Sequence, residues 1–255
     1  MNTRDSSRPA ALLAESVTKD FSGLRALDAV SLRLRRGEVL GLIGPNGSGK
    51  TTLINVISGF LRPTAGRVRI DGVDITGWMP HRIAPLGLAR TFQTIKVFPG
   101  LTVLENVEVA AVSARLSRAQ AKQRAYEVLD RLGQAHLSDV HAAALPYGAE
   151  RRVEIARALA TNPAYLLLDE PAAGLNEAES DELLRTLGSI PREMGCGMLI
   201  IDHDMRLIMR LCDRVQVLNY GMTISEGRPD DVRKDPAVVR AYLGFSVQEG
   251  SRAGT

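Results

Sequence analysis

Short apolar runs bounded by Gly or Asp recur along the chain and give the first indication of its fold. They lie at residues 39–43, 68–70, 165–168, 198–201 and 215–218. Strands that are buried on both faces are apolar almost throughout, so the middle and late runs predict buried strands. In contrast, Arg and Leu alternate within residues 31–35, which predicts a strand with one solvated face.

Helical patterns alternate with these runs. Apolar positions at helical spacing occur over residues 50–58, 150–160, 177–187 and 204–211. An alternation of strands and helices is typical of a mainly parallel sheet that is covered by helices. The sequence therefore predicts an α/β fold.

The composition changes between about Thr102 and Leu145, where Ala, Arg, Gln and Leu recur at helical spacing. This stretch predicts a helical insertion, about residues 95–150 with its flanks, between two halves of the α/β core. Residues 1–10 and 246–255 offer little that a core could bury, and they are expected to be tails. One domain over residues 11–245 remains, which suits a chain of 255 residues.

Charge and composition exclude several classes of protein. A net charge of +3, from 32 basic and 29 acidic residues, is too small for nucleic-acid binding without a basic patch. The arginines at 33, 35 and 36 fit one strand's solvated face rather than such a patch. Cys196 and Cys212 lack the spacing of a metal or redox pair and are expected to be buried thiols. The polar N-terminus is no secretory signal and no run of ~18 apolar residues occurs, so a soluble, cytoplasmic protein is expected.

The segment Gly44-Pro45-Asn46-Gly47-Ser48-Gly49-Lys50-Thr51 matches the pattern GxxxxGK[ST] at every position. It follows an apolar strand and opens a helix, as a phosphate-binding loop requires. Its glycines allow a tight turn in which successive N–H groups point at phosphate oxygens, and the helix N-terminus adds its dipole. Lys50 can reach the β- and γ-phosphates, while the Thr51 hydroxyl can bind Mg²⁺.

Two carboxylates, Asp169 and Glu170, end the predicted strand at 165–168. The carboxyl end of a strand beside a phosphate loop is where a Mg²⁺-binding Asp belongs. If the chain turns there, Asp169 can hold the metal and Glu170 can orient and deprotonate a water. Taken alone, the pair also fits a turn or a helix cap.

His203 follows the predicted strand at 198–201 and lies near the same edge of the sheet. A neutral imidazole there can donate a hydrogen bond to a γ-phosphate or to water, but a cap of the next helix explains the residue equally well. His81, His136 and His141 lack such a setting and are expected to lie at the surface or to have their hydrogen bonds satisfied.

These pieces, in this order and with a helical insertion between the first and second, resemble the ATP-binding cassette family. The resemblance implies a P-loop NTPase core with a mainly parallel sheet, an antiparallel β edge subdomain and an inserted helical subdomain. It implies that the protein binds and hydrolyses ATP with Mg²⁺, and it extends the nucleotide contacts to Thr52. Phe21 matches the aromatic residue that stacks on adenine. Gln93 matches the glutamine that senses the metal and the attacking water.

Under this resemblance the catalytic residues are Lys50, Gln93, Glu170 and His203, and the metal ligands are Thr51, Gln93 and Asp169. Residues 173–176 resemble the loop by which two cassettes touch, with Asn176 in place of the usual Asp. The signature segment, normally close to Leu-Ser-Gly-Gly-Gln, is Leu145-Pro146-Tyr147-Gly148-Ala149 here. Pro146 offers neither hydroxyl nor N–H to a partner's γ-phosphate, so this half-site is expected to be handicapped.

Within this family, the closer resemblance of residues 98–107, 169–176 and 240–244 is to the ATPases of branched-chain amino acid importers and of their relatives for hydrophobic amino acids, amides or small organic acids. The implied partners are transmembrane permease subunits, a second ATPase subunit that is a different chain and, indirectly, a periplasmic or extracellular substrate-binding protein; no nucleic acid is implied. The chain would sit on the inner face of the cell membrane through the permease. A groove for a permease helix is expected to include Phe92, Phe98, Leu101 and Val103.

Two alternatives remain open at this point. A regulatory nucleotide-binding module that no longer hydrolyses ATP is suggested by Pro146 and Ala149, although Lys50, Asp169 and Glu170 are intact. A soluble cassette that acts on nucleic acid or ribosomes usually carries paired cassettes or long coiled-coil insertions, and this sequence shows neither.

Overall fold

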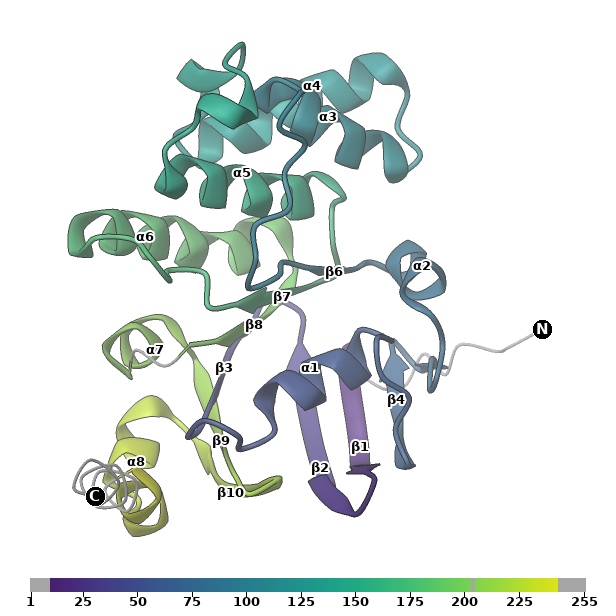
Figure 1. The fold of residues 1–255 in the computed structure, drawn as a ribbon, viewed down its shortest axis with the longest axis vertical. Coiled ribbons are helices and arrows are strands. Elements are labelled where there is room, and N and C mark those ends of the chain that lie inside the picture. Colours follow the sequence, from purple (N-terminus) through teal and green to yellow (C-terminus); the bar gives the residue numbers. More distant parts are fainter. Residues whose placement is uncertain (1–9, 203–204, 243–255) are drawn as a thin grey trace.

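A computed structural model describes residues 10–202 and 205–242 of the chain (Figure 1). Its larger sheet has six strands in the order β10-β9-β3-β8-β7-β6. Neighbouring strands are parallel from β9 to β6, and β10 is antiparallel to β9, so the expected mainly parallel sheet is confirmed. The strands are β3 (Val39–Ile43), β6 (Leu88–Arg90), β7 (Tyr165–Asp169), β8 (Gly197–Ile201), β9 (Arg214–Asn219) and β10 (Met222–Gly227).

A second, four-stranded antiparallel sheet has the order β2-β1-β4-β5 and confirms the expected edge subdomain. Within β2 the alternation of Leu and Arg places Leu32 and Leu34 in the core and leaves Arg33 and Arg35 exposed, as their period of two predicts. The strands are β1 (Ala11–Phe21), β2 (Leu24–Arg35), β4 (Ala65–Ile70) and β5 (Val73–Asp74).

The parallel strands bury side chains on both faces because helices or the second sheet cover each face. One face, with Leu40, Leu42 and Leu199, packs against the antiparallel sheet and against α1 (Lys50–Ile57). The other face carries the alternate residues, such as Val39 and Ile200, and packs against helices. The helices on that face are α5 (Tyr147–Ala160), α6 (Glu177–Met194) and α7 (Met205–Leu211).

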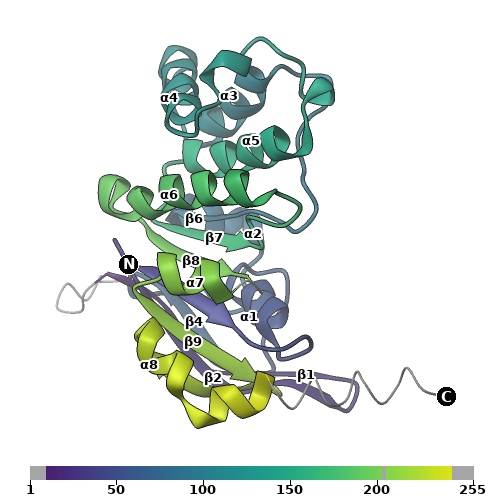
Figure 2. The ribbon, with the colours of Figure 1, turned by 90° about the vertical axis from the view of Figure 1, so that its left-hand side faces the viewer.

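The helices α3 (Val103–Ser113) and α4 (Arg118–Arg131) join α5 at one end of the molecule, beyond α6 and the sheet (Figures 1 and 2). Each begins with a capping box, formed by Thr102 with Glu105 and by Ser117 with Gln120. These reciprocal bonds satisfy N–H groups that a helix start otherwise leaves without partners, so the local sequence fixes where each helix begins.

Two short helices, α2 (Pro80–Ile83) and α8 (Pro229–Lys234), and a helical segment at 236–242 complete the described chain. No helix within residues 10–202 and 205–242 is long and apolar enough to cross a membrane. Cys196 and Cys212 are buried and unbridged, and the histidines at 81, 136 and 141 are exposed, as predicted. Most of the two expected tails lies outside the described residues.

Candidate nucleotide site

The loop 44–51, called the phosphate loop below, connects β3 to the start of α1. Three of its glycines have positive φ: 148° at Gly44, 76° at Gly47 and 104° at Gly49. A Cβ on Gly44 would lie 2.1 Å from the carbonyl oxygen of Leu218, and one on Gly49 would lie 2.7 Å from that of Ala26. The loop therefore packs against the ends of β9 and β2 so closely that only glycine fits at these two positions.

Lys50 folds back over this loop. Its Nζ donates to the carbonyl oxygens of Gly44 at 2.6 Å and Pro45 at 2.9 Å. Burial lowers the pKa of Lys50, and the nearby carboxylates of Glu170 and Asp169 oppose this shift. The structure thus brings the cation of the loop and the two acids at the end of β7 into one place, as the sequence predicted.

Asp169 is the last residue of β7 and is 5% exposed. Its Oδ2 accepts a hydrogen bond from Nη2 of Arg90 at 3.2 Å. Nη1 of Arg90 also donates to Oδ1 of Asn55 at 2.6 Å and to Oγ of Ser58 at 3.0 Å, so α1 holds the arginine in place. Burial raises the pKa of Asp169, and Arg90 opposes the rise. Arg90 therefore favours the charged form of this carboxylate and orients it.

Sequence reasoning missed Arg90. The only signal is an arginine that ends the short strand β6, three positions before Gln93. Because β6 pairs in parallel with β7, the two strands end at the same edge of the sheet, with Arg90 directly beside Leu167. An arginine at that register can reach Asp169, but the register is visible only in the fold.

Glu170 turns away from the strand. Its φ is 49°, and its N–H donates to the carbonyl of Ile201 at 2.8 Å. This left-handed residue redirects the chain directly after Asp169, as the assignment of separate roles to the two acids requires. Nε2 of Gln93 donates to Oε2 of Glu170 at 3.1 Å, so these two predicted site residues meet.

Phe21, the last residue of β1, is 40% exposed, and Nζ of Lys19 lies 4.9 Å from its ring centroid. The ring is thus accessible to a planar ligand.

His203 lies outside the described residues. Among those described, no cluster of three or more His, Cys, Asp or Glu side chains is arranged to hold a metal. A metal here would depend on Asp169 together with the hydroxyl of Thr51, the amide of Gln93 and the ligand's own oxygens, which are the donors that Mg²⁺ prefers.

The signature segment 145–149 differs from its expected form in one respect. Helix α5 begins at Tyr147, earlier than the predicted Glu150, and Pro146 is its N-cap without a side-chain hydrogen bond. The Tyr147 ring packs on Gly174 so tightly that a Cβ there would lie 2.6 Å from Cε1 of the ring. Asn176, at the end of the loop 173–176, caps α6 and forms a capping box with Glu179. The Asn that replaces the usual Asp thus has a local structural role.

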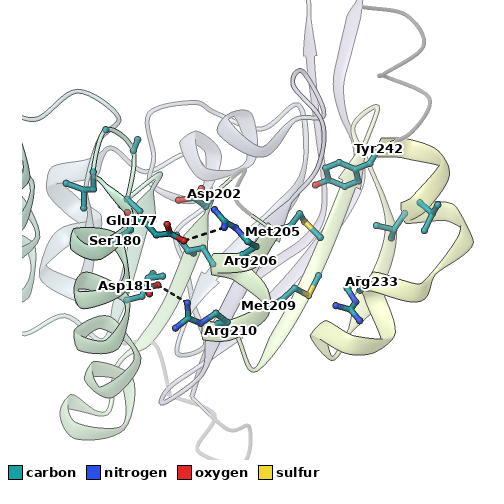
Figure 3. A pocket seen from close by; sticks show the side chains of 18 residues that line it. Glu177, Ser180, Asp181, Asp202, Met205, Arg206, Met209, Arg210, Arg233 and Tyr242 are labelled. Atoms are coloured by element: carbon teal, nitrogen blue, oxygen red, sulfur yellow. Dashed lines mark hydrogen bonds and ion pairs between the residues drawn. The ribbon is translucent and has the colours of Figure 1, made fainter.

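A cavity of about 1050 Å³ lies beside the loop 173–176 (Figure 3). Helices α6 and α7 form much of its wall and are joined there by two ion pairs. The Arg210–Asp181 pair is 2.8 Å long and the Arg206–Glu177 pair is 3.7 Å long. Figure 3 shows Met205 and Met209 of α7 facing toward Arg233 and Tyr242 on the opposite wall. The cavity therefore combines an apolar floor with a charged rim.

A groove of about 880 Å³ runs between the end of α3 and the segments around β6. Phe92 lines it and packs edge-on against Phe60 with ring centroids 5.5 Å apart. The prediction for Val103 was wrong: this residue is completely buried in the core, because it opens the inward face of α3. Neither Leu101 nor Phe98 lines the groove. Phe98 instead packs under the guanidinium of Arg157, 4.6 Å from its ring centroid.

Comparisons with known proteins agree with this geometry. A family model described as ABC transporter matches residues 27–173, and one described as branched-chain amino acid ATP-binding cassette transporter matches residues 222–244. The chain is 38% identical over 253 residues to the high-affinity branched-chain amino acid transport ATP-binding protein BraF of Pseudomonas aeruginosa, covering 93% of this chain and 99% of BraF. It is 40% identical over 239 residues to LivG of Salmonella typhimurium, covering 88% and 94%.

Among solved structures, the fold is similar to the ADP conformation of MJ1267, an ATP-binding cassette of an ABC transporter. The TM-score is 0.83 at 35% sequence identity, and the match covers 93% of this chain and 100% of that one.

Proposed function

This chain belongs to the ATP-binding cassette transporter family, and from that premise we propose that it is the ATP-hydrolysing subunit of an importer for branched-chain or similar hydrophobic amino acids. It binds ATP and acts as an ATPase, as its family does. The cargo follows from the names of BraF and LivG and from the C-terminal match at residues 222–244.

One observation carries the proposal: Lys50 lies near enough to Asp169 and Glu170, at the carboxyl edge of the parallel sheet, for their charges to affect its pKa. The loop that contains Lys50 packs so closely on neighbouring backbone that only glycine fits at positions 44 and 49. Ligands of open α/β sheets bind at this edge. The N–H groups of the phosphate loop and Lys50 would hold the phosphates, and Phe21 would stack on the base.

Magnesium would be held by Asp169, Thr51 and Gln93, and it would neutralise phosphate charge. Glu170 would accept the proton of the attacking water. The amide of Gln93 holds that carboxylate at 3.1 Å, so the base is oriented before the reaction begins. Arg90 would favour the ionised form of Asp169 and orient its carboxylate for the metal.

The groove beside α3 is the proposed contact for the permease. It presents apolar surface from Phe60 and Phe92 beside the cations of Lys96 and Arg157. Phe92 directly precedes Gln93 in the chain, so a helix seated in the groove would contact the segment that carries Gln93. The loop 173–176 and the cavity beside it are proposed to face the second ATPase subunit. The chain would lie at the inner face of the cell membrane through the permease alone.

The test is reconstitution of the chain in vesicles with its permease subunits and the second ATPase chain. We expect ATP enclosed in the vesicle lumen, on the same side of the membrane as the ATPase chain, to drive leucine uptake into the vesicles and to be hydrolysed during uptake. A complex that binds ATP without hydrolysis would support the regulatory alternative instead. A chain that hydrolyses ATP but never co-purifies with permease would support a soluble cassette.

Filling the groove should weaken the permease complex. Ser113 lines the groove at the exposed end of α3, so Ser113→Trp places a large ring where a permease helix would sit. Because overpacking costs about 1–3 kcal/mol, we expect affinity for detergent-solubilised permease to fall roughly tenfold or more. The control is Gln123→Trp on the exposed face of α4. Equal affinity for both variants would show that the permease docks elsewhere.

Pro146→Ser should raise the turnover of the assembled complex. Serine restores both a hydroxyl and an N–H where the partner's γ-phosphate is expected, and a charge-assisted hydrogen bond contributes about 1.5–3 kcal/mol, or roughly ten- to a hundred-fold in closure. Serine is also a better N-cap for α5 than proline, so the melting temperature should rise. Pro146→Ala supplies the N–H alone and separates the two donors. Unchanged turnover in both variants would mean that closure does not depend on this contact.

A further inference from the structure

Arg151 is a buried cation to which the proposed ATP binding and hydrolysis assign no role. It lies in the first turn of α5, directly after the signature segment, and none of its side chain is exposed. Arginine is seldom buried so completely unless every donor is satisfied, because the cost of removing its charge from water is large. Its partners therefore indicate what it is there to hold.

All five N–H donors of the guanidinium have partners. Nη2 donates to the carbonyl oxygens of Asp169 at 2.8 Å and Glu170 at 2.5 Å, and Nε donates to that of Pro171 at 3.3 Å. Nη1 donates to the carbonyl of Phe92 at 2.7 Å and to the carboxylate of Glu154 at 2.8 Å. One side chain thus grips three consecutive peptide carbonyls at the end of β7.

Glu154, one turn further along α5, completes the grip. Its Oε1 accepts from the N–H of Phe92 at 3.3 Å, so the peptide groups on either side of this residue are held by one ion pair. Burial raises the pKa of Glu154, and Arg151 opposes the rise. The pair therefore fixes the backbone next to Gln93 as well as the backbone of Glu170, and these are the two residues whose side chains meet at 3.1 Å.

We propose that Arg151 is a positioning residue that couples the signature helix α5 to the catalytic Glu170. The proposal rests on the proposed function. Glu170 occupies a left-handed conformation, with φ of 49°, which is unfavourable for a residue with a side chain and needs support from its surroundings. Arg151 supplies that support from the helix that carries the signature segment. Any rotation of α5 toward a partner's nucleotide must then move the carbonyls of residues 169–171 and with them the carboxylate.

Arg151→Lys is the direct test, because lysine keeps the charge but has three donors and no planar fork. In the assembled transporter we expect kcat for ATP to fall roughly tenfold or more, while KM and the ATP affinity by calorimetry change less than about twofold, because ATP itself does not touch Arg151. A loss that is merely structural would instead lower binding, turnover and yield together.

Arg152→Lys is the matched control. The neighbouring Arg152 is also buried, at 6% exposed, but its described partners are in α6: Oε2 of Glu182 at 2.8 Å and the carbonyl of Glu179 at 3.4 Å. Arg152→Lys removes the same guanidinium fork from the same turn of α5, although with fewer described hydrogen bonds, and it does not touch residues 169–171, so its kcat should stay within about twofold of wild type. Equal losses of kcat in the two variants would overturn the proposal.

A double-mutant cycle separates this proposal from the proposed function. If Arg151 acts through Glu170, Arg151→Lys should not lower further the residual turnover of Glu170→Gln, because neighbours that act as a unit are not additive. Additive losses would show that Arg151 acts elsewhere. If Arg151→Lys does not fold, the isosteric Glu154→Gln takes its place, and an unchanged kcat there would also overturn the coupling. A wild-type complex without ATPase activity would refute the proposed function instead.

Discussion

Glu170→Gln is expected to lower ATP turnover of the assembled transporter by roughly 100- to 10,000-fold, the range that removal of a general base gives. Glutamine has the same shape, and its carbonyl oxygen can still accept the hydrogen bond from Gln93 that now reaches Oε2 at 3.1 Å. The backbone bond to Ile201 is also unaffected. What disappears is the capacity to accept a proton from water.

The variant should therefore retain nucleotide. We expect calorimetry to give an ATP affinity within a few fold of wild type and the complex to remain closed around ATP for longer. Glu127→Gln, on the exposed side of α4, removes a carboxylate far along the chain from the site and should hydrolyse ATP normally. If Glu170→Gln hydrolyses ATP as fast as that control, another group is the base.

The main layers of the fold were predictable because the spacing of apolar residues along the chain follows from which side chains are buried. The runs at 39–43 and 198–201 are apolar throughout, and both are buried parallel strands in the structure. Helix boundaries were predicted less well where the signal is weaker. Helix α6 continues from the predicted Leu187 to Met194 although Pro191 lies within it. The proline is tolerated in the last turn, where tertiary packing of Ile190 outweighs local propensity.

The candidate site was likewise predictable only in part. The phosphate loop could be predicted because all its geometry is local: a strand end, glycines and a helix start within eight consecutive positions. Arg90 and Arg151 could not, since Asp169 lies 79 positions from Arg90 and the carbonyls of residues 169–171 lie 18 to 20 positions from Arg151, at a strand end that only the tertiary fold brings close to them. Without a partner in view, each reads as an ordinary arginine in an amphipathic element.

Arg90 links the metal-binding carboxylate to helix α1. The sequence assigned Asp169 to magnesium, and the structure pairs one of its oxygens with a buried arginine that α1 anchors through Asn55 and Ser58. Helix α1 also begins with the lysine that is proposed to reach the phosphates. The same helix therefore positions the phosphate-binding cation and, through Arg90, the metal-binding carboxylate, so the two positive charges at the β- and γ-phosphates would both be placed by one helix.

Lys50→Met is expected to reduce ATP affinity by roughly 100-fold or more. The lysine would make charge-assisted hydrogen bonds to two phosphates, each contributing about 1.5–3 kcal/mol, and methionine keeps the length of the side chain without any donor. The structure adds a second loss. Lys50 now holds the carbonyls of Gly44 and Pro45 at 2.6 and 2.9 Å, so the loop also loses its own support.

Calorimetry with ATP and magnesium measures this loss, and a melting curve without nucleotide separates its two parts. If the loop loses its own support, the melting temperature without nucleotide falls together with the ATP affinity; if only the phosphate contact is lost, the ATP affinity falls while the melting temperature without nucleotide stays near that of wild type. Lys122→Met, an exposed substitution on α4, controls for the change of charge. Undiminished affinity in Lys50→Met would contradict the assignment of the loop as the triphosphate site, because no other cation among the described residues is bonded into that loop.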